Sequence, residues 1–151
     1  MPEQQTGESS GGQDYGRPLS IEELSNRFAV HPASSIVERF AIKWGVSANI
    51  ISFLGLGAGF LAALFYYYQD HRVFILAGFI SMFLWHVFDG ADGRVARATG
   101  TSSAFGRIID GMCDHLVFGA VYIALVLYLI NTGSPASVWY VAIAAGLSHA
   151  V

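Results

Sequence analysis

The chain has 151 residues, of which 54% are hydrophobic and only 13% are charged, and its mean hydropathy is +0.49. A soluble domain usually carries about 25% charged residues, so this composition excludes an ordinary soluble domain and indicates a membrane protein. The net charge of −3 offers no basic surface for nucleic acid, and the single cysteine, Cys113, excludes a disulfide framework and a cysteine-based zinc site. Cys113 is expected to be a small packing residue.

The N-terminal part of the chain divides into two segments. Residues 1–18 contain few apolar side chains and are rich in Gly, Ser and Gln, which predicts a disordered tail. Residues 19–46 are predicted to form amphipathic helices. Ser20 and Glu23 form a capping box, so a helix is expected to start at Ser20, and Pro32 is expected to interrupt it.

A second amphipathic stretch covers residues 34–46. One side carries apolar residues and the other mostly charged ones, namely Ile36, Val37, Phe40, Ala41 and Trp44 against Glu38, Arg39 and Lys43. Next to a spanning segment, this pattern is typical of a helix that lies in the membrane interface. The alternative is an ordinary amphipathic helix that packs on protein.

Residues 47–151 are predicted to form a transmembrane domain. No charged side chain lies between Lys43 and Asp70, and a helix needs about 20 residues to cross the hydrocarbon core. Four apolar segments follow one another: from about Asn49 to Tyr68, from Val73 through Trp85 into Asp89 and Asp92, from before Asp110 to about Ile130, and from about Val138 onward. The fourth still continues at Val151, which suggests a piece of a longer protein truncated at the C-terminus; the alternative is a short fourth helix.

Two features of these segments bear on packing and orientation. Gly55, Gly57 and Gly59 thin the first span and allow a neighbouring helix to approach, and residues 66–68, three tyrosines, are expected in the membrane interface. The positive residues predicted on one side of the membrane are Arg39, Lys43, Arg94, Arg97 and Arg107, against Arg72 on the other. The positive-inside rule therefore predicts that the N-terminus and the turn after the second span face the cytoplasm.

Four aspartates stand out in this apolar chain. Asp89 and Asp92 are three residues apart, and Asp110 and Asp114 are four apart, so each pair lies on one face of a helix. Two antiparallel helices joined by a short turn can bring the pairs together. Four carboxylates at that distance repel one another unless cations neutralise them, and oxygen ligands favour Mg²⁺ or Mn²⁺. Two such ions suit phosphoryl chemistry.

The residues between the two pairs fit a ligand that carries phosphate. Gly93 and Ala96 leave room near the backbone, and Arg97 can hold a phosphate with its planar guanidinium. Residues 101–103 add three hydroxyl groups on the turn. The structural alternative is that Asp–Arg pairs neutralise one another inside a helix bundle and that the glycines serve packing alone.

This stretch resembles the signature of the CDP-alcohol phosphotransferases, D-x2-D-G-x2-A-R-x8-G-x3-D-x3-D. The eight fixed positions are filled by Asp89, Asp92, Gly93, Ala96, Arg97, Gly106, Asp110 and Asp114. The likeness extends over roughly residues 33–151. It implies an all-α integral membrane enzyme, a polytopic helix bundle with an N-terminal interfacial helix and six spanning helices, of which about four are present here, and usually a homodimer among membrane lipids.

The resemblance also implies an activity and a set of roles. Such an enzyme transfers a substituted phosphate from a CDP-linked donor, such as CDP-diacylglycerol, to a small alcohol acceptor and releases CMP. The implied ligands of Mg²⁺ or Mn²⁺ are Asp89, Asp92, Asp110 and Asp114, with Asp114 also the general base; the implied donor contacts are Gly93, Ala96, Arg97 and the position of Ser103. The implied membrane is the cell (inner) membrane, with the active site toward the cytoplasm.

One departure from the family pattern concerns the donor. Family members often have a Pro-Asn pair at the start of the first span, whereas this chain has Ala48-Asn49 followed by Ser52, so Asn49 and Ser52 are weak candidates for donor contact. The acceptor is left open. The residues around Cys113 mildly resemble the choline and ethanolamine branch, but the phosphatidylglycerophosphate, phosphatidylserine and inositol-phosphate branches share the signature. His115 either faces the acceptor or is an interfacial helix residue.

Two other function classes compete with the transferase. A cation transporter would use intramembrane carboxylates but would not require Gly93, Ala96 and Arg97 at these offsets. A non-catalytic, truncated membrane subunit would need only packing surfaces. Metal-dependent release of CMP distinguishes the transferase from both.

Overall fold

The computed structural model describes residues 26–149, and every regular element in that range is a helix. A short π-helical turn, η1 (Asn26–Val30), leads directly into α1 (His31–Trp44). The remaining helices are α2 (Ala48–Tyr67), α3 (Arg72–Ala98), α4 (Ala104–Asn131) and α5 (Ala136–His149). The predicted tail over residues 1–18 and the predicted helix start at Ser20 lie outside the described residues.

Three of these helices, α2, α3 and α4, are long and apolar enough to cross a membrane. Their bounds confirm the predicted first three spans, because α3 continues through both of its aspartates and α4 begins before Asp110. The fourth segment is the shorter apolar helix α5, which starts two residues earlier than expected, at Ala136. Large apolar side chains such as Phe53, Phe79 and Ile123 are exposed, as expected for helices in lipid. The chain is thus a polytopic helical membrane protein.

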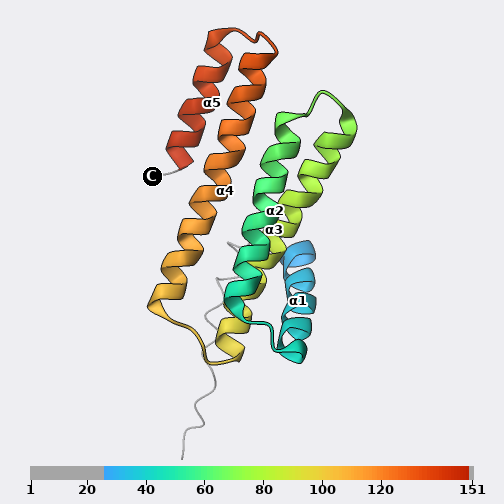
Figure 1. The fold of residues 1–151 in the computed structure, drawn as a ribbon, viewed down its shortest axis with the longest axis vertical. Helices are drawn as coiled ribbons and strands as arrows, with labels where there is room; N and C mark the ends of the chain where they lie inside the picture. Colours follow the sequence, from blue (N-terminus) through green and yellow to red (C-terminus); the bar gives the residue numbers. More distant parts are fainter. Residues whose placement is uncertain (1–25, 150–151) are drawn as a thin grey trace, which may run out of the picture.

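Helix α2 packs against both α3 and α4 (Figure 1). Two of its glycines make these contacts possible. A Cβ atom added at Gly55 would lie 3.2 Å from Phe88 Cβ on α3, and one at Gly59 would overlap Val117 on α4. Gly57 faces open space, so only two of the three predicted packing glycines have a close neighbour.

Helix α1 lies along the outside of α3 (Figure 1) and is fixed by polar contacts. The buried Ser34 hydroxyl donates to the Val87 carbonyl oxygen at 2.9 Å, beside Gly90, whose missing side chain leaves room for it. Arg94 of α3 donates to the Ser35 hydroxyl at 2.7 Å. Pro32 was predicted to interrupt a helix, but it stands in the first turn of α1 directly after η1, so within the described residues the chain stays helical on both sides and changes there from π-helix to α-helix.

The two alternatives for α1 concern different side chains: its packing on protein is confirmed, whereas its place in the membrane interface stays a prediction. Val37 and Ala41 pack toward the core, whereas Ile36, Phe40 and Trp44 form an exposed apolar stripe, with Trp44 74% exposed. The helix therefore packs on protein with one face and exposes an apolar stripe on another, a pattern typical of helices in the membrane interface.

The corner between α1 and α2 and the turn between α3 and α4 lie at the same end of the bundle (Figure 1). Gly45 and Gly100, both in the left-handed conformation with φ of 66° and 67°, allow the chain to leave α1 and α3 there. All four aspartates lie in the half of α3 and α4 nearest this end. The opposite end carries the α2–α3 loop with Asp70 and Arg72.

Candidate functional site

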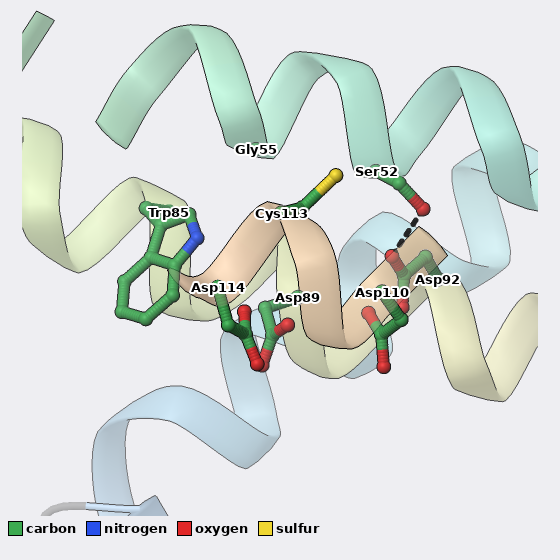
Figure 2. Close-up of a pocket in the computed structure, with 8 residues that line it drawn as sticks. All are labelled: Ser52, Gly55, Trp85, Asp89, Asp92, Asp110, Cys113 and Asp114. Carbon is green, nitrogen blue, oxygen red and sulfur yellow. Dashed lines mark hydrogen bonds between the residues drawn. The ribbon is translucent and has the colours of Figure 1, made fainter. Parts of the chain in front are cut away.

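The four aspartates line one small pocket between α2, α3 and α4 (Figure 2). Asp89 and Asp92 come from α3, Asp110 and Asp114 from α4, so the two antiparallel helices bring the pairs together as their spacing predicts. The other lining residues are Ser52, Gly55, Trp85 and Cys113. The pocket has a volume of about 10 Å³, close to the minimum for one water-sized group.

Asp92 and Asp110 lie at one end of this pocket. Asp92 is the most buried of the four aspartates, with 5% of its surface exposed. Its Oδ2 atom accepts a hydrogen bond of 2.5 Å from the Ser52 hydroxyl of α2 (Figure 2). A carboxylate buried among helices needs such a partner, because an uncompensated charge in an apolar surrounding is costly.

Asp89 and Asp114 lie at the other end, beside Trp85 (Figure 2). Their carboxyl groups face each other (Figure 2). Among the described residues, Asp114 Oδ1 is a buried oxygen without a hydrogen-bond partner. Two carboxyl groups in contact must share either a proton or a cation, so this end of the pocket has the capacity to bind a positive ion.

The donor chemistry of the pocket fits a hard divalent cation. The four carboxyl groups supply oxygen ligands, which Mg²⁺ and Mn²⁺ prefer, and the unpartnered Asp114 oxygen leaves one ligand position unused. Within residues 26–149, no three His, Cys, Asp or Glu side chains are already arranged to hold an ion. Binding would therefore require the aspartate side chains to turn toward a common centre.

A second, much larger cleft of about 900 Å³ adjoins the pocket, within the range of about 300–1,000 Å³ for small-molecule sites. All the residues predicted to contact the donor line it: Asn49, Ser52, Gly93, Ala96, Arg97 and Ser103. Its walls come from the α1–α2 corner, the end of α3 and the start of α4. Ser52, Asp92 and Asp110 line both cavities, so the cleft opens onto the Asp92 end of the carboxylate pocket.

The polar wall of the cleft suits an anionic ligand. The guanidinium of Arg97 lies over Gly93, since a Cβ atom at Gly93 would be 3.3 Å from Arg97 Nη1. Ser103 is the N-cap of α4, and its hydroxyl accepts a hydrogen bond of 2.9 Å from the Gly106 N–H. The cleft is thus bordered by a helix N-terminus, which favours negative charge, and by two arginines, Arg97 and Arg107.

Several lining residues were not predicted as part of a site. Cys113 packs between α4 and α2 as expected, but it does so inside the carboxylate pocket. Trp85 is held there by an edge-to-face contact with Phe118, with ring centroids 5.0 Å apart. Arg107, which the sequence marks only as a positive charge near the turn, lines the large cleft. Its position directly after Gly106 of the aspartate motif was the available signal.

The structure places His115 at the surface of α4, outside both cavities. Its side chain is exposed, lines neither cavity, and its Nδ1 atom contacts the Gly111 carbonyl oxygen at 2.6 Å. It therefore behaves as a helix residue at the surface of α4 rather than as part of the pocket.

Comparison with known proteins places this geometry in a family. Residues 45–150 match the model of the CDP-alcohol phosphatidyltransferase family. Phosphatidylinositol phosphate synthase of Mycobacteroides abscessus is 32% identical over 85 residues, covering 56% of this chain and 37% of that protein. The synthase of the same name from Corynebacterium glutamicum is 33% identical over 104 residues, covering 66% of this chain and 45% of the relative.

A third relative, from Mycobacterium tuberculosis and also a phosphatidylinositol phosphate synthase, is 26% identical over 104 residues, which is 69% of this chain and 46% of the relative. The chain spans less than half the length of these curated relatives. No solved structure matches the chain at a comparable level of significance.

Proposed function

Because the chain belongs to the CDP-alcohol phosphatidyltransferase family, we propose that it transfers a phosphatidyl group from CDP-diacylglycerol to an inositol phosphate and releases CMP. The observation that carries this proposal is the pocket of four carboxylates that opens into a cleft lined by every predicted donor contact. The names of the relatives support an inositol phosphate as acceptor, in place of the choline or ethanolamine branch.

The donor is proposed to occupy the large cleft. Its phosphates would bind Arg97 and the N-terminal turn of α4, where Gly93 and Ala96 leave room near the α3 backbone. The diphosphate would then reach the Asp92 and Asp110 end of the carboxylate pocket, because these residues border both cavities.

The transfer forms one P–O bond and breaks another. The acceptor hydroxyl oxygen attacks the phosphorus next to the diacylglycerol, its proton passes to the Asp114 carboxylate, and CMP leaves with the electron pair of the broken bond. Asp114 lines the carboxylate pocket but not the large cleft. Base and donor would therefore stand on opposite sides of the reacting phosphorus, as an in-line displacement requires.

We propose that Asp89, Asp92, Asp110 and Asp114 hold Mg²⁺ or Mn²⁺ in the active protein. When bound, a divalent ion would neutralise the negative charge of the carboxylates and the charge that develops on the phosphate oxygens. The oxygen donor set and the unpartnered Asp114 oxygen support this assignment. Asp89, Asp92 and Asp110 would hold the ion to which the phosphate end of the donor binds, and Asp114 would stand beside them as the general base.

The proposed location is the cell (inner) membrane, with the carboxylate pocket toward the cytoplasm and a second copy of the chain as dimer partner. The grouping of Arg94, Arg97 and Arg107 at one end of the bundle supports this orientation. The exposed apolar surfaces of the spans support contact with lipid and with another helical surface.

The first experiment measures CMP release from CDP-diacylglycerol by the chain in membrane vesicles, with and without Mn²⁺ or Mg²⁺. The acceptors would be inositol phosphate, glycerol phosphate, serine, inositol and choline. We expect metal-dependent release that is strongest with inositol phosphate. CMP release with another alcohol would support a transferase with a different acceptor from the one proposed. CMP release from CDP-choline or CDP-ethanolamine alone would show that the donor is not CDP-diacylglycerol.

Matched variants make this assay specific. Asp92→Asn and Asp110→Asn keep the side-chain shape and remove a charged ligand, so each should abolish turnover. Asp70→Asn makes the same change in the loop at the opposite end of the bundle and should leave turnover unchanged. If no donor supported release and the protein also failed to bind CDP-diacylglycerol in the presence of Mn²⁺, the non-catalytic or transport alternatives would be preferred.

A further inference from the structure

We propose that Ser52 is a positioning residue for Asp92, which it holds at the boundary between the carboxylate pocket and the donor cleft. The proposal deepens the proposed function and rests on its assignment of Asp92 as a ligand of a divalent cation. It gives Ser52 a task toward Asp92 that differs from the direct donor contact predicted from the sequence.

The first observation behind this proposal is the pair of hydrogen-bond acceptors near the Ser52 hydroxyl. The hydroxyl has one hydrogen and lies 2.5 Å from Asp92 Oδ2 and 3.2 Å from the Ala48 carbonyl oxygen one turn earlier in α2. A serine inside a helix commonly donates to the carbonyl four residues back. Here the carboxylate is nearer, and bonds to a charged acceptor are roughly twice as strong as neutral ones, so the hydrogen belongs to Asp92.

The second observation is where the Ser52–Asp92 hydrogen bond lies in the site. Ser52 belongs to α2, whereas the four aspartates belong to α3 and α4, so the bond ties the third helix of the site to the carboxylates. Only Ser52, Asp92 and Asp110 line both cavities among the described residues. By occupying Oδ2, the hydroxyl leaves Oδ1 as the Asp92 oxygen that can turn toward a cation in the pocket.

The test uses the full chain in detergent micelles and measures Mn²⁺ binding directly by electron paramagnetic resonance. Loss of a partner that orients a metal ligand commonly lowers metal affinity by about 10–100-fold, and we expect a decrease of this size for Ser52→Ala. Ser52→Thr keeps a hydroxyl at the same position and should restore most of the affinity. Ser81→Ala removes a buried hydroxyl from α3 outside both cavities and should bind Mn²⁺ like the unaltered chain.

Turnover separates positioning from donor contact. If Ser52 acts through Asp92, raising the Mn²⁺ concentration should bring the CMP release of Ser52→Ala toward that of the unaltered chain, with the KM for CDP-diacylglycerol little changed. A raised KM that excess Mn²⁺ does not correct, together with unaltered Mn²⁺ affinity, would overturn the inference and make Ser52 a donor contact.

The two proposals fail in different ways. Mn²⁺ binding that is identical in the unaltered chain and in Ser52→Ala would overturn only the role of Ser52. An unaltered chain that binds no Mn²⁺ would overturn the metal assignment and this inference together. Helix content measured by circular dichroism identifies a variant that has failed to fold; in that case Ser52→Cys, which keeps the side-chain shape but has a much weaker hydrogen-bond donor, replaces Ser52→Ala with the same expected decrease in Mn²⁺ affinity.

Discussion

Asp92 and Asp114 stand at opposite ends of the carboxylate pocket, and this position separates the tasks that each can perform. Asp92 borders the donor cleft and is held by Ser52, whereas Asp114 lies beside Trp85 with one oxygen unpartnered. A side chain at the position of Asp114 can accept a proton without touching the nucleotide of the donor. The proposed general base therefore lies outside the cleft in which the donor is proposed to bind.

We expect Asp114→Asn to lower turnover far more than donor binding, because the amide cannot accept the proton of the acceptor hydroxyl. General-base catalysis commonly contributes about 100–10,000-fold, so a decrease in kcat within that range is expected. Single-turnover CMP release and equilibrium binding of CDP-diacylglycerol check the two quantities. Near-unaltered rates would show that Asp114 is not the base, and equal loss of binding would make it a donor contact.

Arg97 is the arginine whose place in the cleft is best defined, since its guanidinium lies against Gly93. Arg97→Ala should weaken binding of CDP-diacylglycerol by about 10–100-fold, the equivalent of the roughly 1.5–3 kcal/mol that a hydrogen bond to a charged group contributes. Arg72→Ala, at the opposite end of the bundle, is the matched control and should bind the donor normally. Unchanged affinity in Arg97→Ala would remove this residue from the phosphate site.

At the scale of the elements, the contact between α2 and α4 depends on a missing side chain. A Cβ atom at Gly59 would overlap the Val117 side chain, which is fully buried, so one of the two helices must move to accept it. At Gly57, two residues away on the same helix, a Cβ atom would meet nothing within 4 Å. These positions therefore form a matched pair with opposite surroundings.

Gly59→Ala should lower the free energy of unfolding by about 1–3 kcal/mol, the usual cost of inserting a methyl group into a packed contact. Gly57→Ala should leave stability unchanged or slightly raised, because alanine favours the helix over glycine. Thermal unfolding of both variants in the same detergent measures the difference. Equal stability of the two variants would show that α2 and α4 separate easily at this point.

The helices themselves could be predicted because each is bounded by a local signal. The loop at residues 68–71 and the turns after Ala98 and Asn131 interrupt apolar runs of spanning length. The faces of the helices could be predicted less well. α1 carries too many apolar residues for one face, and only its contact with α3 decides that Val37 is covered while Phe40 is exposed.

At the scale of the whole molecule, the site combines local and distant residues. The aspartates and Arg97 could be predicted because they stand at fixed spacing on either side of one turn. Cys113 and the α1–α2 corner could not, because their place depends on how α1 and α2 rotate against the later helices. The Ser52–Asp92 bond joins residues 40 apart in the sequence, and no local pattern indicates it.

The proposed orientation of the molecule rests on where its two ends place positive charge. The end with the α1–α2 corner and the α3–α4 turn carries Lys43, Arg94, Arg97 and Arg107, whereas the other end carries Arg72. An excess of Lys and Arg near the ends of the spans is retained on the cytoplasmic side. The donor cleft lies at the positive end, so the proposed topology also gives it access to water-soluble acceptors of the cytoplasm.

Cysteine labelling in intact bacterial cells tests this orientation, since the chain has only one cysteine to remove. In a Cys113→Ala background, Ser102→Cys places a thiol on the α3–α4 turn and Asp70→Cys places one in the α2–α3 loop, both at exposed positions. A membrane-impermeant maleimide should label the Asp70→Cys protein in intact cells, and the Ser102→Cys protein only after the membrane is permeabilised. The reverse labelling pattern would contradict the proposed topology, because it would place the large cleft outside the cytoplasm. CDP-linked donors and phosphorylated acceptors would then have to be exported to reach the cleft, so the proposed supply of substrate would be contradicted as well.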